Sequence, residues 1–220
     1  MPARKPPRRT RERILETALA LFNRVGEPNV TTADIADEMA ISPGNLYYHF
    51  ANKDEIIGEL YGKLERAIAP LLAVPSDRPP GVEDLWLLLH LLFERMWTFR
   101  FFYRDLDEIT SRNRRIAMRF AGLTRGGEAT LLAICRGMRE EGTLHATDRE
   151  LAALAHNVAL VATYWMSFQR IEHAWRGATR AGAEEHADLD FAAYQVLALI
   201  APFLRHDQRA LIEKLGVEYL

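Results

Sequence analysis

Apolar residues recur every three or four positions along most of the chain, which is the spacing of amphipathic helices. From residue 82 onward no stretch alternates apolar and polar residues with a period of two, as a half-buried strand would. No glycine-rich phosphate-binding loop is present there either. The pattern therefore predicts an all-α fold with nine or ten helices.

The first predicted helix begins at Thr10 and carries its apolar residues on one face. Gly26 and Pro28 are expected to end it. The preceding residues 1–9 contain three prolines and no hydrophobic pattern, so we predict an unstructured basic arm. The first thirteen residues have a net charge of +5, although the whole chain has a formal charge of −2. Any surface for nucleic acid must therefore be local.

Residues 31–50 predict two short helices joined by a tight turn. Thr31 or Thr32 can cap the first helix, with Asp34 completing a short capping box after Thr31. The chain turns near residues 40–41, and Ser42 followed by Pro43 is a favourable start for the second helix.

The second short helix has one apolar face and one polar face. At about 100° per residue, Leu46 and Phe50 share the inner side, while Gly44 and Tyr48 lie roughly opposite. Asn45 and Tyr47 fall on the flanks of the outer face, which suits the major groove of DNA. The alternative is an ordinary helical hairpin within an all-α domain.

Residues 41–50, ISPGNLYYHF, followed by Asn52-Lys53-Asp54-Glu55, closely resemble the DNA-reading segment of the TetR family of bacterial transcriptional regulators. Residues 13–22 and Gly26 are similar to that family's first helix, and residues 30–36 to its second. The resemblance covers about the first sixty residues and implies a one-component repressor. Asn45 departs from the small or hydroxyl residue that many relatives carry there.

The predicted DNA contacts follow from this pattern and from the resemblance. Major-groove contacts are expected from Gly44, Asn45, Tyr47 and Tyr48, with Pro43 starting the helix. Phosphate contacts are expected from Thr31, Thr32, Ser42, His49, Lys53, Arg8 and Arg9.

The domain boundary is expected near a proline-rich segment at residues 74–81. A helix that runs from about residue 53 to 73 precedes this segment and links the two domains. We predict a basic flexible arm over 1–9, a helix-turn-helix DNA-binding domain over 10–60, and an effector-binding and dimerisation domain over 61–220. Later helices are expected at 82–103 and at 114–141, the latter with a possible interruption at Gly126-Gly127.

The large domain carries more aromatic side chains than packing alone requires, which indicates a ligand cavity, a subunit interface, or both. The resemblance implies both: a small apolar or aromatic effector, and a homodimer formed by the helices near 148–175 and 188–205. A homodimer also follows from physics, because one short recognition helix reads too few base pairs, whereas two copies read a palindromic operator. The candidate pocket residues are His90, Trp97, Arg100, Phe101, Phe102, Met118, Phe120, Asn157, Tyr164, Trp165 and Phe168.

Composition excludes several classes of protein. The single cysteine, Cys135, forbids an internal disulfide and fits a reduced, cytoplasmic compartment. The apolar run from Leu151 to Phe168 contains His156 and Asn157, so it is expected to be a buried core helix rather than a membrane span. No catalytic residue pair, metal motif or cofactor motif is found, so we expect no enzyme, metal or cofactor.

Two alternatives to a ligand-responsive repressor stay open. The first is a DNA-binding protein without an effector, because a filled core and an open pocket look alike in sequence. The second is a helical carrier of lipids or other hydrophobic ligands whose N-terminal unit docks on a protein.

Overall fold

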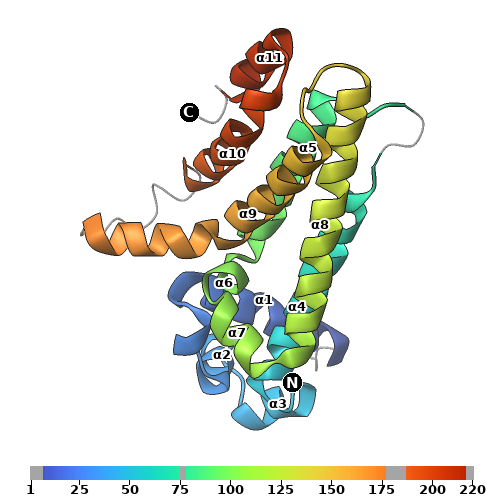
Figure 1. Cartoon of the computed structure of the whole chain (residues 1–220). Coiled ribbons are helices and arrows are strands. Elements are labelled where there is room, and N and C mark those ends of the chain that lie inside the picture. The colour runs from blue at the N-terminus through green and yellow to red at the C-terminus, as the bar shows by residue number, and fades with distance from the viewer. Residues whose placement is uncertain (1–6, 75–77, 177–186, 217–220) are drawn as a thin grey trace. The chain divides into compact units, whose positions relative to one another are not determined.

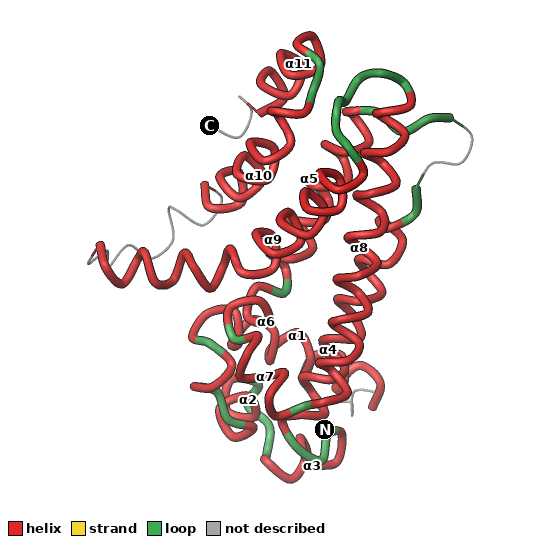
Figure 2. Tube along the Cα trace, viewed as in Figure 1, coloured by secondary structure: helices red, strands yellow, loops and turns green. Residues whose placement is uncertain are grey.

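The computed structural model describes residues 7–74, 78–176 and 187–216, and over these residues it is all-α, with eleven α-helices and three short 3₁₀ helices (Figures 1 and 2). The α-helices are α1 (Pro7–Val25), α2 (Thr32–Glu38), α3 (Pro43–His49), α4 (Lys53–Ile68), α5 (Val82–Thr98), α6 (Arg100–Arg104), α7 (Leu106–Arg112), α8 (Arg114–Glu140), α9 (Asp148–Arg176), α10 (Ala187–Ile200) and α11 (His206–Gly216). The 3₁₀ helices are η1 (Glu27–Asn29), η2 (Ala69–Leu72) and η3 (Ala201–Phe203). The predicted all-α class is confirmed.

The chain forms two compact units. The first contains Met1–Arg66 together with Phe99–Met118, and the second contains Ala67–Thr98 and Arg119–Leu220. Helices α6 and α7 and the first turn of α8 therefore belong to the N-terminal unit, although the predicted domain division assigned them to the second. The boundary passes through α4 and α8, so both helices are shared by the two units.

Aromatic packing explains why the α6–α7 segment joins the first unit. The ring of Phe101 lies 5.2 Å from that of Phe22 in α1, and the ring of Phe102 lies 5.0 Å from that of Tyr61 in α4. All four side chains are at most 1% exposed. Burying an aromatic side chain removes a large apolar area from water, so these contacts fix α6 on α1 and α4.

Two predicted boundaries are wrong, and the possible interruption of a third helix is not found. Helix α1 begins at Pro7 rather than at a Thr10 cap, because proline is well suited to the first position of a helix. The helix predicted over 82–103 ends at Thr98, and the amide of Phe101 instead donates to Oδ1 of Asn23 at 3.0 Å. Helix α8 continues through Gly126 and Gly127 without interruption. The split of the second segment raises the helix count to eleven among the described residues.

The second unit is a helical bundle in which α10 packs on α9 and α5, and α11 packs on α5 and α10. The end of η2 is held against α8, where the hydroxyl of Thr130 donates to the carbonyl oxygen of Leu72 at 2.7 Å. Further along α8, Gly137 lies directly under Pro80. A Cβ atom at residue 137 would be 2.6 Å from Cδ and Cγ of Pro80. The proline-rich segment thus requires glycine at this helix position.

Replacing Gly137 by alanine is expected to destabilise the second unit by about 1–3 kcal/mol, because the new methyl group overlaps the proline ring. Urea unfolding measures the loss. Gly127→Ala in the same helix is the matched control: nothing lies within 4 Å of its added Cβ, so it should gain about 0.5–1 kcal/mol from helix propensity. Equal effects of the two substitutions would contradict the proposed overlap.

Candidate nucleic-acid interface

Helices α2 and α3 are joined by a turn that the backbone fixes closely. Thr31 caps α2, and its capping box with Asp34 is complete. At the other end the amide of Ile41 donates to the carbonyl of Ala36 and that of Ala40 to the carbonyl of Asp37, both at 3.0 Å. Ala40 has a φ of 52°, so these bonds form the left-handed closure typical of a helix C-terminus. The angle between the two helices is therefore set by hydrogen bonds.

Helix α3 has the predicted inner and outer faces. Leu46 and Phe50 are at most 1% exposed and anchor the helix in the unit, which confirms their predicted inner position. Tyr48 is 78% exposed and Tyr47 is 52% exposed. Pro43, Gly44 and Asn45 are exposed as well, whereas His49 is half-buried. Large aromatic side chains are seldom left this exposed, and an exposed aromatic surface with an adjacent amide is typical of a binding site.

The hydroxyl groups around this face have defined partners. The Oγ1 atom of Thr32 and the phenol oxygen of Tyr47 are 3.0 Å apart, so Tyr47 is positioned by a hydrogen bond across the two helices. Ser42 caps α3 and accepts from the amide of Asn45 at 3.2 Å. The backbone amide of Thr31, and then its hydroxyl, lower the pKa of Asp34. Asp34 is therefore a stable anion beside the turn.

The basic N-terminal residues are partly engaged in structure. The guanidinium of Arg11 lies 4.5 Å above the ring of Phe50 and 3.1 Å from the carboxylate of Glu59. Arg9 is exposed in the first turns of α1. The side chain of Arg8 lies outside the described part of the structure, so its predicted phosphate contact stays a prediction.

Lys53, a predicted phosphate contact, lies in a different environment. Its ammonium group is 2.8 Å from the carboxylate of Glu27 and donates to the carbonyl oxygens of Glu27 and Val30 at 3.1 and 2.9 Å. An ammonium group has three N–H donors, and each has a partner here. The lysine therefore links the first turn of α4 to η1 and has no remaining N–H donor for a DNA phosphate.

Glu27 is the centre of an ionic cluster that the sequence did not indicate. Its side chain is 0% exposed, and Arg112 at the end of α7 donates to both of its carboxylate oxygens at 3.0 and 2.9 Å. Its backbone amide donates to Asp105 at 2.9 Å. A buried carboxylate is tolerated only when it is paired and hydrogen-bonded, and here two cations from distant parts of the chain meet that requirement.

A second set of bonds holds α6 against the end of α1. Arg104 donates to the backbone carbonyl oxygens of Phe22 and Asn23. These carbonyls lie near the end of α1, where backbone donors become scarce, and the carbonyl of Phe22 also accepts from the amide of Gly26 at 3.0 Å. The bonded partners among residues 23, 27, 104, 105 and 112 are up to 85 positions apart, and no local pattern in the sequence marks them as partners.

The eleven predicted pocket residues are divided between the two units. Arg100, Phe101, Phe102 and Met118 belong to the first unit; Phe101 and Phe102 are core residues there, and Met118 is 68% exposed. The remaining seven, which are His90, Trp97, Phe120, Asn157, Tyr164, Trp165 and Phe168, lie in the second unit. Aromatic residues of a core and of a pocket have the same sequence pattern, so spacing could not separate them.

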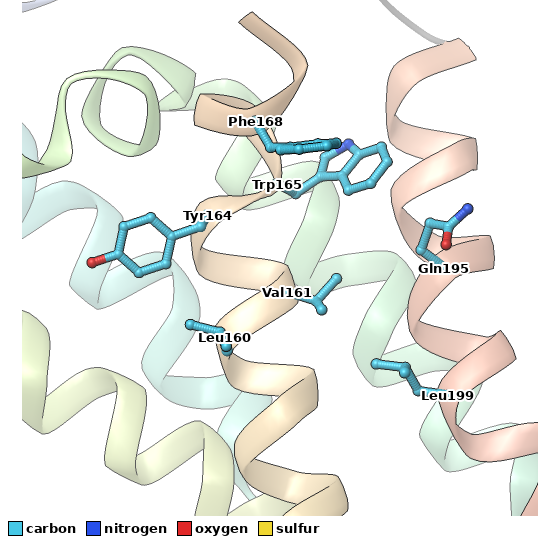
Figure 3. Close-up of a pocket in the computed structure, with 7 residues that line it drawn as sticks. All are labelled: Leu160, Val161, Tyr164, Trp165, Phe168, Gln195 and Leu199. Carbon is cyan, nitrogen blue, oxygen red and sulfur yellow. The ribbon is translucent and has the colours of Figure 1, made fainter. Parts of the chain in front are cut away.

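Three of the predicted residues, Tyr164, Trp165 and Phe168, do line one hollow of the second unit. It lies between α9 and α10 and has a volume of about 350 Å³ (Figure 3). The other lining residues are Leu160, Val161, Gln195 and Leu199. A volume of this size fits a small ligand, and an apolar wall with one amide group fits a mainly apolar one.

Helix α9 is not the fully buried core helix that was expected. An apolar stripe made of Leu160, Tyr164, Phe168, Ile171 and Trp175 spans an arc of about 80° on α9, and every member is at least 42% exposed. The window over Asp148–Glu172 is apolar and long enough to cross a membrane, with 33% of it buried. An exposed apolar stripe on a helix is typical of a protein interface.

Two family models match the chain. Residues 14–60 match the model described as bacterial regulatory proteins of the tetR family, and residues 63–212 match TetR, bacterial transcriptional repressor. A crystal structure of a TetR-family transcriptional regulator from Marinobacter aquaeolei VT8 is 34% identical, covers 96% of this chain and 98% of that one, and has a TM-score of 0.83. The SmeT–triclosan complex, at 18% identity and a TM-score of 0.57, covers 91% of this chain and 94% of that one and has the same fold.

Curated relatives match mainly the N-terminal part. The transcriptional repressor KstR2 of Mycobacterium tuberculosis H37Rv is 46% identical over 79 residues, which are 33% of this chain and 40% of that protein. A probable acrEF/envCD operon repressor of Escherichia coli K12 is 38% identical over 53 residues, 24% of each chain. The chain thus aligns with less than half the length of these relatives.

Replacing Glu27 by glutamine is expected to reduce the free energy of unfolding by about 2–3 kcal/mol, because Lys53 and Arg112 lose their shared counter-charge. The value is lower than for a wholly buried pair since the two cations are 22% and 36% exposed. Urea unfolding followed by circular dichroism measures it. Glu59→Gln removes the half-exposed partner of Arg11 and should cost less than about 1 kcal/mol. The cluster is not structural if Glu27→Gln costs no more than this control.

Proposed function

Because the chain belongs to the TetR family of bacterial transcriptional regulators, we propose that it is a repressor that binds a palindromic DNA operator through α2 and α3. The observation that supports this most directly is the outer face of α3. It presents Asn45, Tyr47 and Tyr48 to solvent above the buried anchors Leu46 and Phe50. A rigid helix with an exposed amide and phenols can enter the major groove and contact base edges.

The proposed contacts divide into two kinds. Gly44, Asn45 and Tyr48 face bases: the glycine permits close approach, the amide bonds a base edge, and the phenol ring packs on thymine methyl groups. Tyr47, held by Thr32, is assigned to the DNA backbone together with Ser42, His49 and the arginines of the N-terminus. Thr31 serves mainly as the cap of α2, although it is exposed beside them.

The working form in this proposal is a homodimer that uses α9 and α10. The exposed stripe on α9 supplies apolar surface for a two-fold interface, and two recognition helices then read two half-sites. The hollow between α9 and α10 lies beside the stripe and shares Leu160, Tyr164 and Phe168 with it.

A small apolar or aromatic effector is proposed to bind in the second unit, with the hollow between α9 and α10 as the candidate site. Helices α4 and α8 both continue across the boundary between the units, so a shift of either helix in the second unit is transmitted to the first. The effector weakens DNA binding only to the extent that it binds more tightly to a dimer whose two DNA-binding units are arranged unfavourably for the operator.

The two alternatives differ from this proposal in what they bind. A regulator without an effector binds the operator equally well in the presence of any apolar compound, whereas a hydrophobic carrier binds such compounds and no DNA site. Titration of the operator complex with apolar aromatic compounds, followed by fluorescence anisotropy, distinguishes all three.

A selection of genomic fragments with the purified protein is expected to recover one palindromic site. Tyr48→Ala should weaken binding to that site at least about tenfold, since a good base contact is worth about 1–3 kcal/mol in each half-site. Val25→Ala, an exposed apolar change at the end of α1 in the same unit, is the control and should retain the site. Recovery of no site above background at low salt would contradict the function.

Ile171→Glu places a charge near the middle of the stripe on α9 and is expected to convert the dimer to monomers, because a desolvated unpaired charge disfavours the interface. Sedimentation equilibrium gives the mass. Leu87→Glu on α5, at 48% exposure, is the control and should stay dimeric. A dimer that persists in Ile171→Glu would assign the interface to another surface.

A further inference from the structure

We propose that Arg114 and Arg115, at the corner between α7 and α8, form a second phosphate-binding surface of the DNA-binding unit. They would bind the DNA backbone next to the bases contacted by α3. The inference rests on the proposed function and extends it, because both arginines lie outside the helix-turn-helix and outside residues 14–60, which match the family's DNA-binding model.

The corner lies beside the segment that leaves the recognition helix. Arg112, the last residue of α7, is 2.9 Å from Glu27 and 3.9 Å from the carboxylate of Asp54. Asp54 is in the first turn of α4, and residues 50–52 join that turn to the end of α3. Figure 1 shows the α7–α8 corner at the same end of the first unit as α3. Arg114 and Arg115 are therefore close to the proposed DNA surface, although they lie far from it in sequence.

The corner is also held rigidly. The side chain of Asn113 accepts a hydrogen bond from the amide of Ile116 at 3.1 Å and so caps α8, and the amide of Ala117 donates to the Asn113 carbonyl at 3.0 Å. Ile116 is 2% exposed and anchors the first turn in the unit. With Ile116 pointing inward, Arg114 and Arg115 are exposed. A fixed cation loses less conformational freedom on binding phosphate than one on a mobile loop.

The charges at the corner favour an external anion. The nearby carboxylates of Glu27, Asp54 and Glu108 all lie within 3.9 Å of Arg112. Among the described residues, no acid is in contact with Arg114 or Arg115. The first turn of α8 contains no acidic residue, and cations at a helix N-terminus oppose the helix dipole. Neither arginine has an acidic partner among the described residues that would compensate for this position. A DNA phosphate supplies the missing negative charge.

The test is the salt dependence of operator binding by Arg114→Gln/Arg115→Gln, measured by fluorescence anisotropy with the selected operator. Glutamine keeps the helix propensity and removes the charge. Each phosphate contact contributes about 0.9 to the slope of log K against log salt, so two contacts per protomer should reduce the slope of a dimer by about 3–4. Binding should weaken by the same factor for operator variants, because phosphate contacts carry no base preference.

The matched control is Arg125→Gln/Arg136→Gln. These arginines are exposed on the same helix but lie in the second unit, and the double change alters the net charge of the chain equally. The control should keep the wild-type slope, and equal thermal melting curves of the two variants show that both are folded. The inference is overturned if the Arg114/Arg115 variant keeps the wild-type slope while Tyr48→Ala still loses the site. Failure of the wild-type protein to select any site overturns the proposed function itself.

Discussion

A single carboxylate excluded from water dictates how the N-terminal unit is assembled. Glu27 lies fully buried after the glycine that ends α1, and Lys53 and Arg112 supply its counter-charges. Because an unpaired charge in this position would be very costly, η1, α4 and α7 must all be in place at the same time. The same cluster joins the first turn of α4 and the end of α7 to η1, and residues 50–52 connect that turn of α4 to the end of α3. The proposed DNA-binding surface is thus positioned by a buried carboxylate that makes no DNA contact in the proposal.

Local chemistry explains which parts of this arrangement could be predicted from sequence. The faces of α3 follow from the helical period, and the caps at Thr31 and Ser42 follow from hydroxyl groups placed before helical patterns. The cluster around Glu27 could not be predicted, since it joins residues up to 85 positions apart. Phe101 and Phe102 show the same limit. Their positions in the helical pattern show only that they are buried. The tertiary fold determines that they pack on Phe22 and Tyr61 in the first unit rather than around a ligand.

Helix α9 has two apolar faces that differ in their exposure to solvent. Leu151, Leu154, Val158 and Ala162 are buried within the second unit, while the stripe from Leu160 to Trp175 is exposed. Because both faces are apolar, the helix is as hydrophobic as a membrane span and is also long enough to be one. In the proposed dimer the second face is covered by another copy of the chain, and the hollow beside it is bordered by the same residues. Subunit association and ligand binding then depend on one shared apolar surface.

The discontinuous first unit limits how such a regulator can be recombined. The proposed division of function between the two units suggests fusing the DNA-binding unit to another sensor domain, with the junction placed after residue 66, where the N-terminal segment ends. That cut leaves behind Phe99–Met118, and with it the aromatic cover of Phe22 and Tyr61 and the arginine that balances Glu27. A DNA-binding unit moved without this segment exposes Phe22 and Tyr61 and leaves the carboxylate of Glu27 without Arg112. A complete DNA-binding unit therefore needs both the N-terminal segment and the segment Phe99–Met118, which begins after thirty-two intervening residues. Moving the unit into another protein then requires three junctions, whereas a continuous N-terminal domain would require one.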